Sequence, residues 1–98
     1  MHSAWVYILT NDRKTVLYVG ATTAIATRHW EHITKQNPKS FTARYNVFRL
    51  VYVEWFETFD DALQREKVLK RKPRKWKEQL ITSKNSQWED LSYLIRLL

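Results

Sequence analysis

Two short stretches near the N-terminus, Trp5-Val-Tyr-Ile-Leu9 and Val16-Leu-Tyr-Val19, decide the fold that this chain is expected to adopt. Both are rich in β-branched and aromatic residues, and a short polar segment separates them, so together they predict a β-hairpin. If the turn is centred on residues 12–13, Tyr7 lies directly across from Tyr18. Cross-strand neighbours share a face, with Cβ atoms roughly 5 Å apart, so two phenols are expected side by side.

A helix is expected to begin shortly after this hairpin. Gly20, the only glycine in the chain, follows the second strand and marks a backbone position that needs a positive φ or the close approach of another group. A threonine at position 22 or 23 is expected to cap a helix that runs to about residue 35. Arg28 and His32, four residues apart, project together along one edge of its apolar stripe. That stripe is predicted to consist of Ile25, Ala26, Trp30 and Ile33.

The remaining elements complete a small α/β domain. We expect a loop over 36–46, a third strand over 47–56 that is apolar enough to be central, a helix opened by Thr58 or Asp60 and ended by Pro73, and shorter helices over 74–82 and 88–98. The expected architecture is a small, mainly antiparallel sheet of three strands flanked by helices. At 98 residues the chain is long enough for one domain, which would span residues 1–98.

The composition favours one class of partner and excludes several kinds of chemical site. Seventeen Lys and Arg against ten Asp and Glu give a net charge of +7, which favours a polyanionic partner and above all nucleic acid. The chain has no Cys, which excludes disulfides, thiolate metal sites and cysteine nucleophiles. The longest early apolar run is too short for a membrane span or a signal-peptide core, so a cytoplasmic location is expected.

A run of basic residues between positions 67 and 77 contains no acid. It is the expected nucleic-acid-binding surface, although such a run is about as often a solvated helical face. The candidate binding residues are Lys67, Lys70, Arg71, Lys72, Arg74, Lys75 and Lys77.

Glu66 precedes this run and shares the predicted inward face of its helix with Ala62 and Leu69. An unpaired carboxylate is costly there, so Glu66 is the natural protein ligand for a hard cation such as Mg²⁺ or Mn²⁺. The alternative is an ordinary ion pair with Lys70, four residues on, worth about 0.3–0.5 kcal/mol.

Five features in order resemble the GIY-YIG nuclease superfamily, and in particular its small single-domain, excision-repair-nuclease-like branch. They are Val6-Tyr-Ile8, Tyr18-Val-Gly20, the helix with Arg28 and His32, Gln64-Arg-Glu-Lys67, and Asn85 followed by Trp88 and Asp90-Leu91. Phe41-Thr-Ala-Arg-Tyr45 and Leu50-Val-Tyr-Val-Glu54 are similar to the same branch. The sequence departs from the family pattern at Val6, Val19 and Ser86, where a glycine, an isoleucine and a proline are common.

The resemblance implies a DNA endonuclease that hydrolyses phosphodiester bonds with one Mg²⁺ or Mn²⁺ on Glu66, with repair or recombination as the natural setting. It implies that Tyr7 is the general base and Tyr18 a positioning group. From the residues alone either tyrosine could activate the water, with His32 relaying the proton. Arg28 would hold the scissile phosphate, and Asn85 would be the last member of the catalytic set.

Each of these residues also has an ordinary structural interpretation. Tyr7 and Tyr18 could be amphipathic core residues, and Arg28 could be a surface ion-pair former with Glu31 or Glu89. His32 could be a simple surface or core histidine, and Asn85 could be a helix cap.

Two rival functions follow from the same sequence. A non-catalytic module could bind nucleic acid through the basic run, with steep salt dependence and no turnover. A protein adaptor could dock its apolar end, residues 93–98, on a partner. The expected partners are therefore DNA and, as open alternatives, a second copy of the chain or a protein that supplies specificity.

Overall fold

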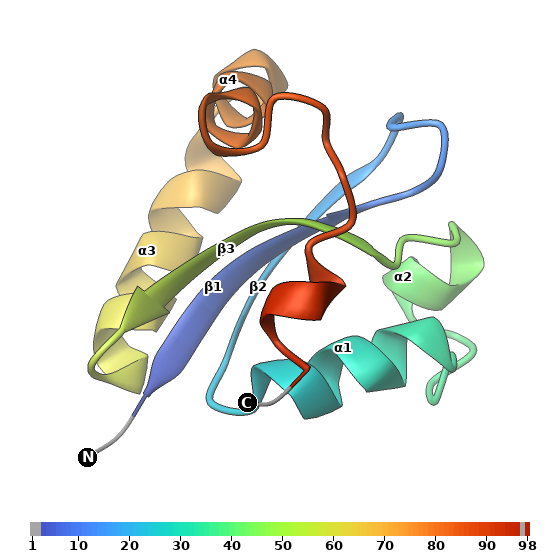
Figure 1. Cartoon of the computed structure of the whole chain (residues 1–98), viewed down its shortest axis with the longest axis horizontal. Coiled ribbons are helices and arrows are strands. Elements are labelled where there is room, and N and C mark those ends of the chain that lie inside the picture. The colour runs from blue at the N-terminus through green and yellow to red at the C-terminus, as the bar shows by residue number, and fades with distance from the viewer. Residues whose placement is uncertain (1–2, 97) are drawn as a thin grey trace.

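A computed structural model describes residues 3–96 and 98 of the chain. A three-stranded antiparallel sheet lies between two layers of helices (Figure 1), as expected. Its elements are β1 (Ala4–Thr10), β2 (Leu17–Thr22), α1 (Ile25–Ile33), α2 (Phe41–Arg44), β3 (Arg49–Phe56), α3 (Phe59–Arg71), α4 (Arg74–Lys84) and a 3₁₀ turn, η1 (Ser92–Leu94). None of the described helices is long and apolar enough to cross a bilayer.

The hairpin forms, but its register differs from the expected one. Tyr7 pairs with Gly20, and Tyr18 pairs with Leu9. The turn lies one residue later than predicted because the Asn11 side chain organises a longer loop, in which its Oδ1 accepts from the backbone N–H of Thr15 at 2.8 Å. A shift of one residue in the turn moves the pairing by two. Side chains alternate with period two, so the tyrosines still share a face.

The prediction that the third strand is central was wrong. The strand order is β2-β1-β3, which makes β3 an edge strand. Its apolar composition reflects cover from the C-terminal segment, because Leu50 O accepts from the backbone N–H of Leu91 at 2.7 Å and Val51 O accepts from the Asn85 side chain at 3.1 Å. These bonds occupy carbonyl groups on an edge strand that would otherwise need water or another chain.

Helix α1 is shorter than expected and buries a different face. It starts after Ala24, and the Thr22 hydroxyl accepts from the Ala24 N–H before the helix instead of capping it. Ile25 and His29 are buried, whereas two members of the predicted stripe, Trp30 and Ile33, are exposed. The buried His29 side chain keeps a hydrogen-bond partner, because its Nε2 lies 2.7 Å from Phe48 O.

Two other local predictions also need correction. The segment 36–46 is not all loop, since Ser40 caps the short helix α2 by accepting from the Ala43 N–H. The predicted helix over 88–98 shrinks to η1, in which Ile95 is buried and Tyr93 and Leu94 are exposed; residue 97 lies outside the described residues. Helix α3 follows its prediction, with Thr58 as N-cap and an end before Pro73.

The two faces of the sheet carry separate cores. Val6 and Ile8 of β1 pack with Ala62, Leu69 and Ile81 on the side of α3 and α4. Tyr7 and Leu9 pack with Ile25, Leu50 and Ile95 on the side of α1 and the C-terminal turn (Figure 1).

Candidate active site

The candidate site is built around the two tyrosines of the hairpin, Tyr7 and Tyr18. Tyr7 lies on the central strand and is 3% exposed, and its ring centroid lies 6.2 Å from that of Tyr18. Gly20 sits directly opposite Tyr7, and a Cβ at this position would overlap the Cζ and hydroxyl oxygen of the Tyr7 ring. The close approach of that ring therefore explains the glycine, whose φ is not positive.

His32 of α1 links these tyrosines to α2. Its Nε2 lies 3.1 Å from the Tyr7 hydroxyl, and its Nδ1 lies 2.8 Å from Thr42 Oγ1. The His32 ring also meets the Tyr18 ring edge-on, at 5.4 Å between centroids. The predicted juxtaposition of Tyr7, Tyr18 and His32 is thus present, and Thr42 joins it.

The surroundings of His32 and Tyr7 determine their protonation states near neutral pH. Burial, followed by the positive charge of Arg28, lowers the pKa of His32 to about 4, so the ring is neutral. Burial, followed by the nearby Tyr18, raises the pKa of Tyr7 above its ordinary value, while Arg28 acts in the opposite direction. Tyr7 therefore keeps its hydroxyl proton, and a neutral imidazole is its hydrogen-bond partner.

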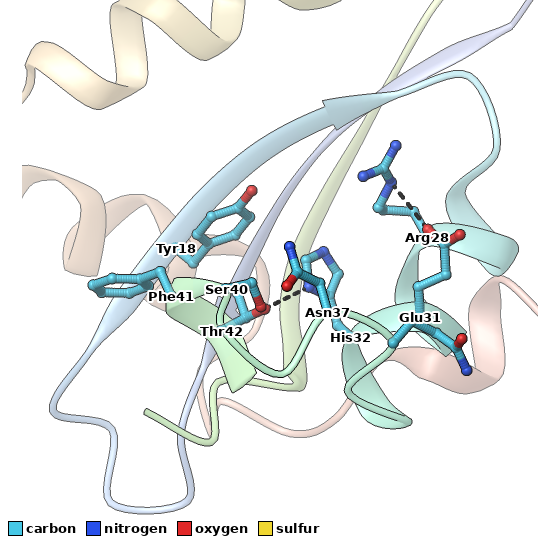
Figure 2. Close-up of a pocket in the computed structure, with 9 residues that line it drawn as sticks. Tyr18, Arg28, Glu31, His32, Asn37, Ser40, Phe41 and Thr42 are labelled. Atoms are coloured by element: carbon cyan, nitrogen blue, oxygen red, sulfur yellow. Dashed lines mark hydrogen bonds and ion pairs between the residues drawn. The ribbon is translucent and has the colours of Figure 1, made fainter. Parts of the chain in front are cut away.

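A pocket of about 440 Å³ opens beside this cluster (Figure 2). Tyr18 and Phe41 stand at one end of the labelled residues and Arg28 at the other. Arg28 lies 3.5 Å from Glu31, and both side chains are about half exposed. Such an exposed pair contributes little, so the guanidinium can turn to an incoming anion. The lining residues are Tyr18, Arg28, Glu31, His32, Gln36, Asn37, Ser40, Phe41 and Thr42.

Glu66 reaches this region from α3. Its side chain is 17% exposed, and its negative charge adds to the raised pKa of Tyr7, which places the carboxylate within electrostatic reach of that hydroxyl. It also makes the ion pair with Lys70, at 3.5 Å, that the spacing allows. Within residues 3–96 and 98, no three His, Cys, Asp or Glu side chains gather into a metal-binding cluster. Glu66 is thus a single carboxylate, a donor set that suits a hydrated hard cation.

Asn85 lies at the end of α4 and is 8% exposed. Its Nδ2 donates to Val51 O at 3.1 Å and to Glu89 O at 2.9 Å, while its Oδ1 accepts from the Glu89 N–H at 3.0 Å. These bonds attach the C-terminal segment to β3. Among the described side chains, these bonds connect Asn85 to neither the tyrosines nor His32. The helix before which Asn85 could have been a cap is reduced to η1, so the side chain joins the C-terminal segment to β3 and caps no helix there.

The basic run follows the end of α3 and the start of α4, and its members have different surroundings. Arg74 uses its guanidinium within the protein, donating to Thr15 O at 2.7 Å, Lys14 O at 2.8 Å and Glu78 at 2.8 Å. Lys72 Nζ lies 4.9 Å from the centre of the Trp76 ring. Lys67, Arg71 and Lys75 are exposed.

The sequence reasoning missed Thr42, Ser40 and His29. The first two fall in the segment that was expected to be a loop, although a Ser three residues before Ala43 is a recognisable capping signal. The resemblance of residues 41–45 to the small single-domain branch was the other available signal. His29 was missed because helical periodicity alone favours apolar residues for a buried face.

Comparisons with known proteins find relatives of nearly the whole chain and of its fold. The family model of the GIY-YIG catalytic domain matches residues 3–79. A UPF0213 protein of Streptococcus pneumoniae serotype 4 is 35% identical over 92 residues, covering 94% of this chain and 90% of that protein, and its counterpart in a second strain of the species is 34% identical. The solution NMR structure of the UPF0213 protein BH0048 from Bacillus halodurans is 30% identical, with a TM-score of 0.57 over 90% of this chain and 92% of that one.

Proposed function

Because the chain belongs to the GIY-YIG family, we propose that it is a metal-dependent endonuclease that hydrolyses phosphodiester bonds in DNA. The observation that carries the proposal is a pocket lined by Arg28 and His32, with the hydroxyl of the buried Tyr7 3.1 Å from His32 Nε2. In this proposal residues 1–98 form one nuclease domain.

Tyr7 activates the attacking water. Its oxygen receives a proton from the water while its own hydroxyl proton passes to His32 Nε2, 3.1 Å away. The raised pKa leaves almost no Tyr7 phenolate near neutral pH, but in this mechanism the Tyr7 hydroxyl needs only to pass a proton on. Tyr18, whose ring lies 6.2 Å from that of Tyr7, positions the water.

Two positive charges would act on the scissile phosphate, one on Arg28 and one on a cation held by Glu66. Arg28 leaves its weak pair with Glu31 and presents its planar set of donors to the phosphoryl oxygens. Glu66 would hold one Mg²⁺ or Mn²⁺, with water completing the coordination. Lys70 would give way, since a half-exposed lysine forms a weak pair. When bound, the cation would neutralise charge on the phosphate and the departing oxygen.

The basic run holds the DNA backbone near this centre. Lys67, Lys70, Arg71, Lys72, Lys75 and Lys77 are its proposed phosphate-contacting members, and Arg74 contributes mainly through its contacts within the protein. Phosphate contacts position a duplex without reading its sequence. We therefore expect structure-dependent or weakly sequence-specific cutting, suited to repair or recombination in the cytoplasm, with specificity supplied by a second copy or a partner.

The test is cleavage of labelled duplex, nicked, flap, junction and single-stranded DNA, and of RNA, with Mg²⁺, Mn²⁺ or a chelator. Arg28→Ala and Glu66→Gln should each abolish metal-dependent cleavage while DNA binding changes little. Arg13→Ala and Glu57→Gln, at exposed positions on the hairpin turn and before α3, are the matched controls and should cut normally.

Different failures point to different conclusions. Tight, salt-sensitive binding without cleavage of any substrate would favour the non-catalytic binding module. Cleavage that survives Glu66→Gln would reject Glu66 as the metal ligand, and loss of binding in step with cleavage would count against its catalytic role.

A further inference from the structure

Four polar side chains form a continuous line from the centre of the sheet to the surface. The Tyr7 hydroxyl lies 3.1 Å from His32 Nε2, His32 Nδ1 lies 2.8 Å from Thr42 Oγ1, and Thr42 Oγ1 lies 3.3 Å from Ser40 Oγ. Figure 2 shows the contact between His32 and Thr42. The line crosses three elements, β1, α1 and the start of α2, so only the tertiary fold assembles it.

The direction of the hydrogen bonds follows from donor and acceptor chemistry. A buried tyrosine O–H needs an acceptor, and His32 Nε2 is the partner found for it among the described residues. A neutral imidazole carries one N–H and one lone-pair nitrogen. If Nε2 accepts from Tyr7, the proton must sit on Nδ1, and Thr42 Oγ1 must be its acceptor.

The surroundings of Thr42 satisfy this arrangement. Its side chain is buried, the residue being 4% exposed, and its backbone carbonyl is fixed by a 2.8 Å bond from the Val47 N–H. The hydroxyl proton of Thr42 can go to Ser40 Oγ, which already accepts from the Ala43 N–H at 3.3 Å. The donors of Tyr7, His32 and Thr42 then each have an acceptor, and the line ends at the half-buried Ser40.

We propose that Thr42 is a positioning residue whose hydroxyl accepts from His32 Nδ1–H and so selects the tautomer in which Nε2 takes the proton of Tyr7. This rests on the proposed nuclease function. In the reaction, water gives a proton to the Tyr7 oxygen, the Tyr7 O–H bond breaks, and a new N–H bond forms at His32 Nε2. The imidazolium keeps its Nδ1–H bond to Thr42, and its extra proton returns to solvent after the product leaves.

The tautomer can be tested without any cleavage assay. In ¹⁵N-labelled protein near pH 7, the nitrogen shifts of His32 should show a protonated Nδ1 and a lone-pair Nε2. Thr42→Val, which keeps the shape and removes the hydroxyl, should reduce the population of that tautomer, and Thr42→Ser should restore it. A wild-type His32 protonated at Nε2, or a tautomer unchanged by Thr42→Val, would overturn the proposal.

Steady-state kinetics of Thr42 variants distinguish a positioning role of the hydroxyl from a role in packing. Thr42→Val should lower kcat about 10- to 100-fold, part of the roughly 10²–10⁴-fold that a positioned acid–base group supplies, with KM nearly unchanged and activity recovered in Thr42→Ser. The matched control is Thr82→Val, because Thr82 Oγ1 also accepts from a ring N–H, that of Trp88, at 2.9 Å. It should retain the wild-type kcat.

The two proposals can fail separately. A protein that cleaves nothing, but whose His32 tautomer is the expected one and changes in Thr42→Val, would retain the role of Thr42 in selecting that tautomer and reject the nuclease. If the protein cleaves DNA and Thr42→Val has the wild-type kcat, the nuclease function is retained and the role of Thr42 is rejected. If Thr42→Val does not fold, the wild-type shifts and Thr42→Ser still decide, since an Nε2-protonated ring in either protein rejects the assignment.

Discussion

The central strand β1 contributes side chains to both faces of the sheet, but the buried side chains on the two faces differ in chemical character. Val6 and Ile8 of β1 meet Ala62, Leu69 and Ile81 on the side of α3 and α4, which we call the packing face. On the other side, the site face, Tyr7 lies among Leu9 and Ile25 and points its hydroxyl to His32.

Each face contains one buried tyrosine, and the contrast between the two is informative. Tyr52, 2% exposed on the packing face, donates to Glu54 at 2.9 Å, and Glu54 also accepts from Arg65 at 3.0 Å. Burial and this contact raise the pKa of Tyr52 to about 12. Tyr52 thus bonds to a carboxylate whose charge is paired, whereas Tyr7 bonds to a neutral imidazole that can take a proton. Burial alone does not distinguish a structural tyrosine from a chemical one, but the partner does.

The largest expected effect comes from removing one hydroxyl from each face. Tyr7→Phe should lower kcat by about 10²–10⁴-fold, because proton transfer from the water loses its first acceptor. Tyr52→Phe keeps catalysis and loses about 1 kcal/mol of stability with its hydrogen bond. Single-turnover cleavage and chemical denaturation of both variants measure the two effects, and equal activities would remove the distinction between the faces.

A cavity on the packing face should affect stability alone. Leu69 is fully buried, so Leu69→Ala should reduce the free energy of unfolding by about 2–5 kcal/mol. Its neighbour Val68 is 43% exposed, and Val68→Ala serves as the control with a change below about 1 kcal/mol. Urea denaturation gives both values, while kcat per folded molecule should stay at the wild-type level. A large fall in kcat for Leu69→Ala at low temperature would contradict this separation.

Gly20→Ala tests how closely the backbone approaches the Tyr7 ring. The added methyl group would overlap the ring, and such overpacking costs about 1–3 kcal/mol. It should also displace the hydroxyl from His32 and lower kcat. A double-mutant cycle with Tyr7→Leu isolates the clash, because Gly20→Ala should cost much less stability once the ring is gone. Additive costs would show that the glycine serves another purpose.

The pH dependence should reflect the neutral state of His32. Its pKa is about 4 in the folded protein and about 6.5 in the unfolded chain. Between these values the unfolded state binds a proton that the folded state excludes, so stability should fall as pH drops from about 6.5 towards 4. Melting temperatures measured across this range should fall more steeply for the wild type than for His32→Gln, and kcat should show no acid limb near pH 6.5. Parallel melting curves would contradict the lowered pKa.

The smallest effects concern the basic run. Lys75 is exposed, so Lys75→Ala should weaken DNA binding a few-fold and reduce the slope of affinity against salt concentration by about one. Arg74→Ala should instead lower the melting temperature, because Arg74 ties α4 to the carbonyls of Lys14 and Thr15. Binding titrations at several salt concentrations, with thermal melts, distinguish the two. A full unit of slope lost in Arg74→Ala would place that residue on the DNA.

Much of the fold could be predicted because its signals are local. The two strands of the hairpin, the Thr58 cap and the break at Pro73 depend on residues within a few positions of one another. Errors arose where distant segments compete. The apolar strand β3 was expected to be central, but the C-terminal segment covers it, and the face of α1 was misjudged because His29 finds a carbonyl on residue 48.

The sequence by itself determined the hairpin with both tyrosines on one face, the Arg28–His32 spacing and the basic run, because side-chain periodicity and charge are properties of the chain. Only the tertiary structure decided that Gly20 makes room for the Tyr7 ring, that His32 bridges Tyr7 to Thr42, and that Arg74 is used internally. These contacts join residues 10 to 59 positions apart, and their geometry depends on how the helices pack on the sheet, which no local pattern encodes.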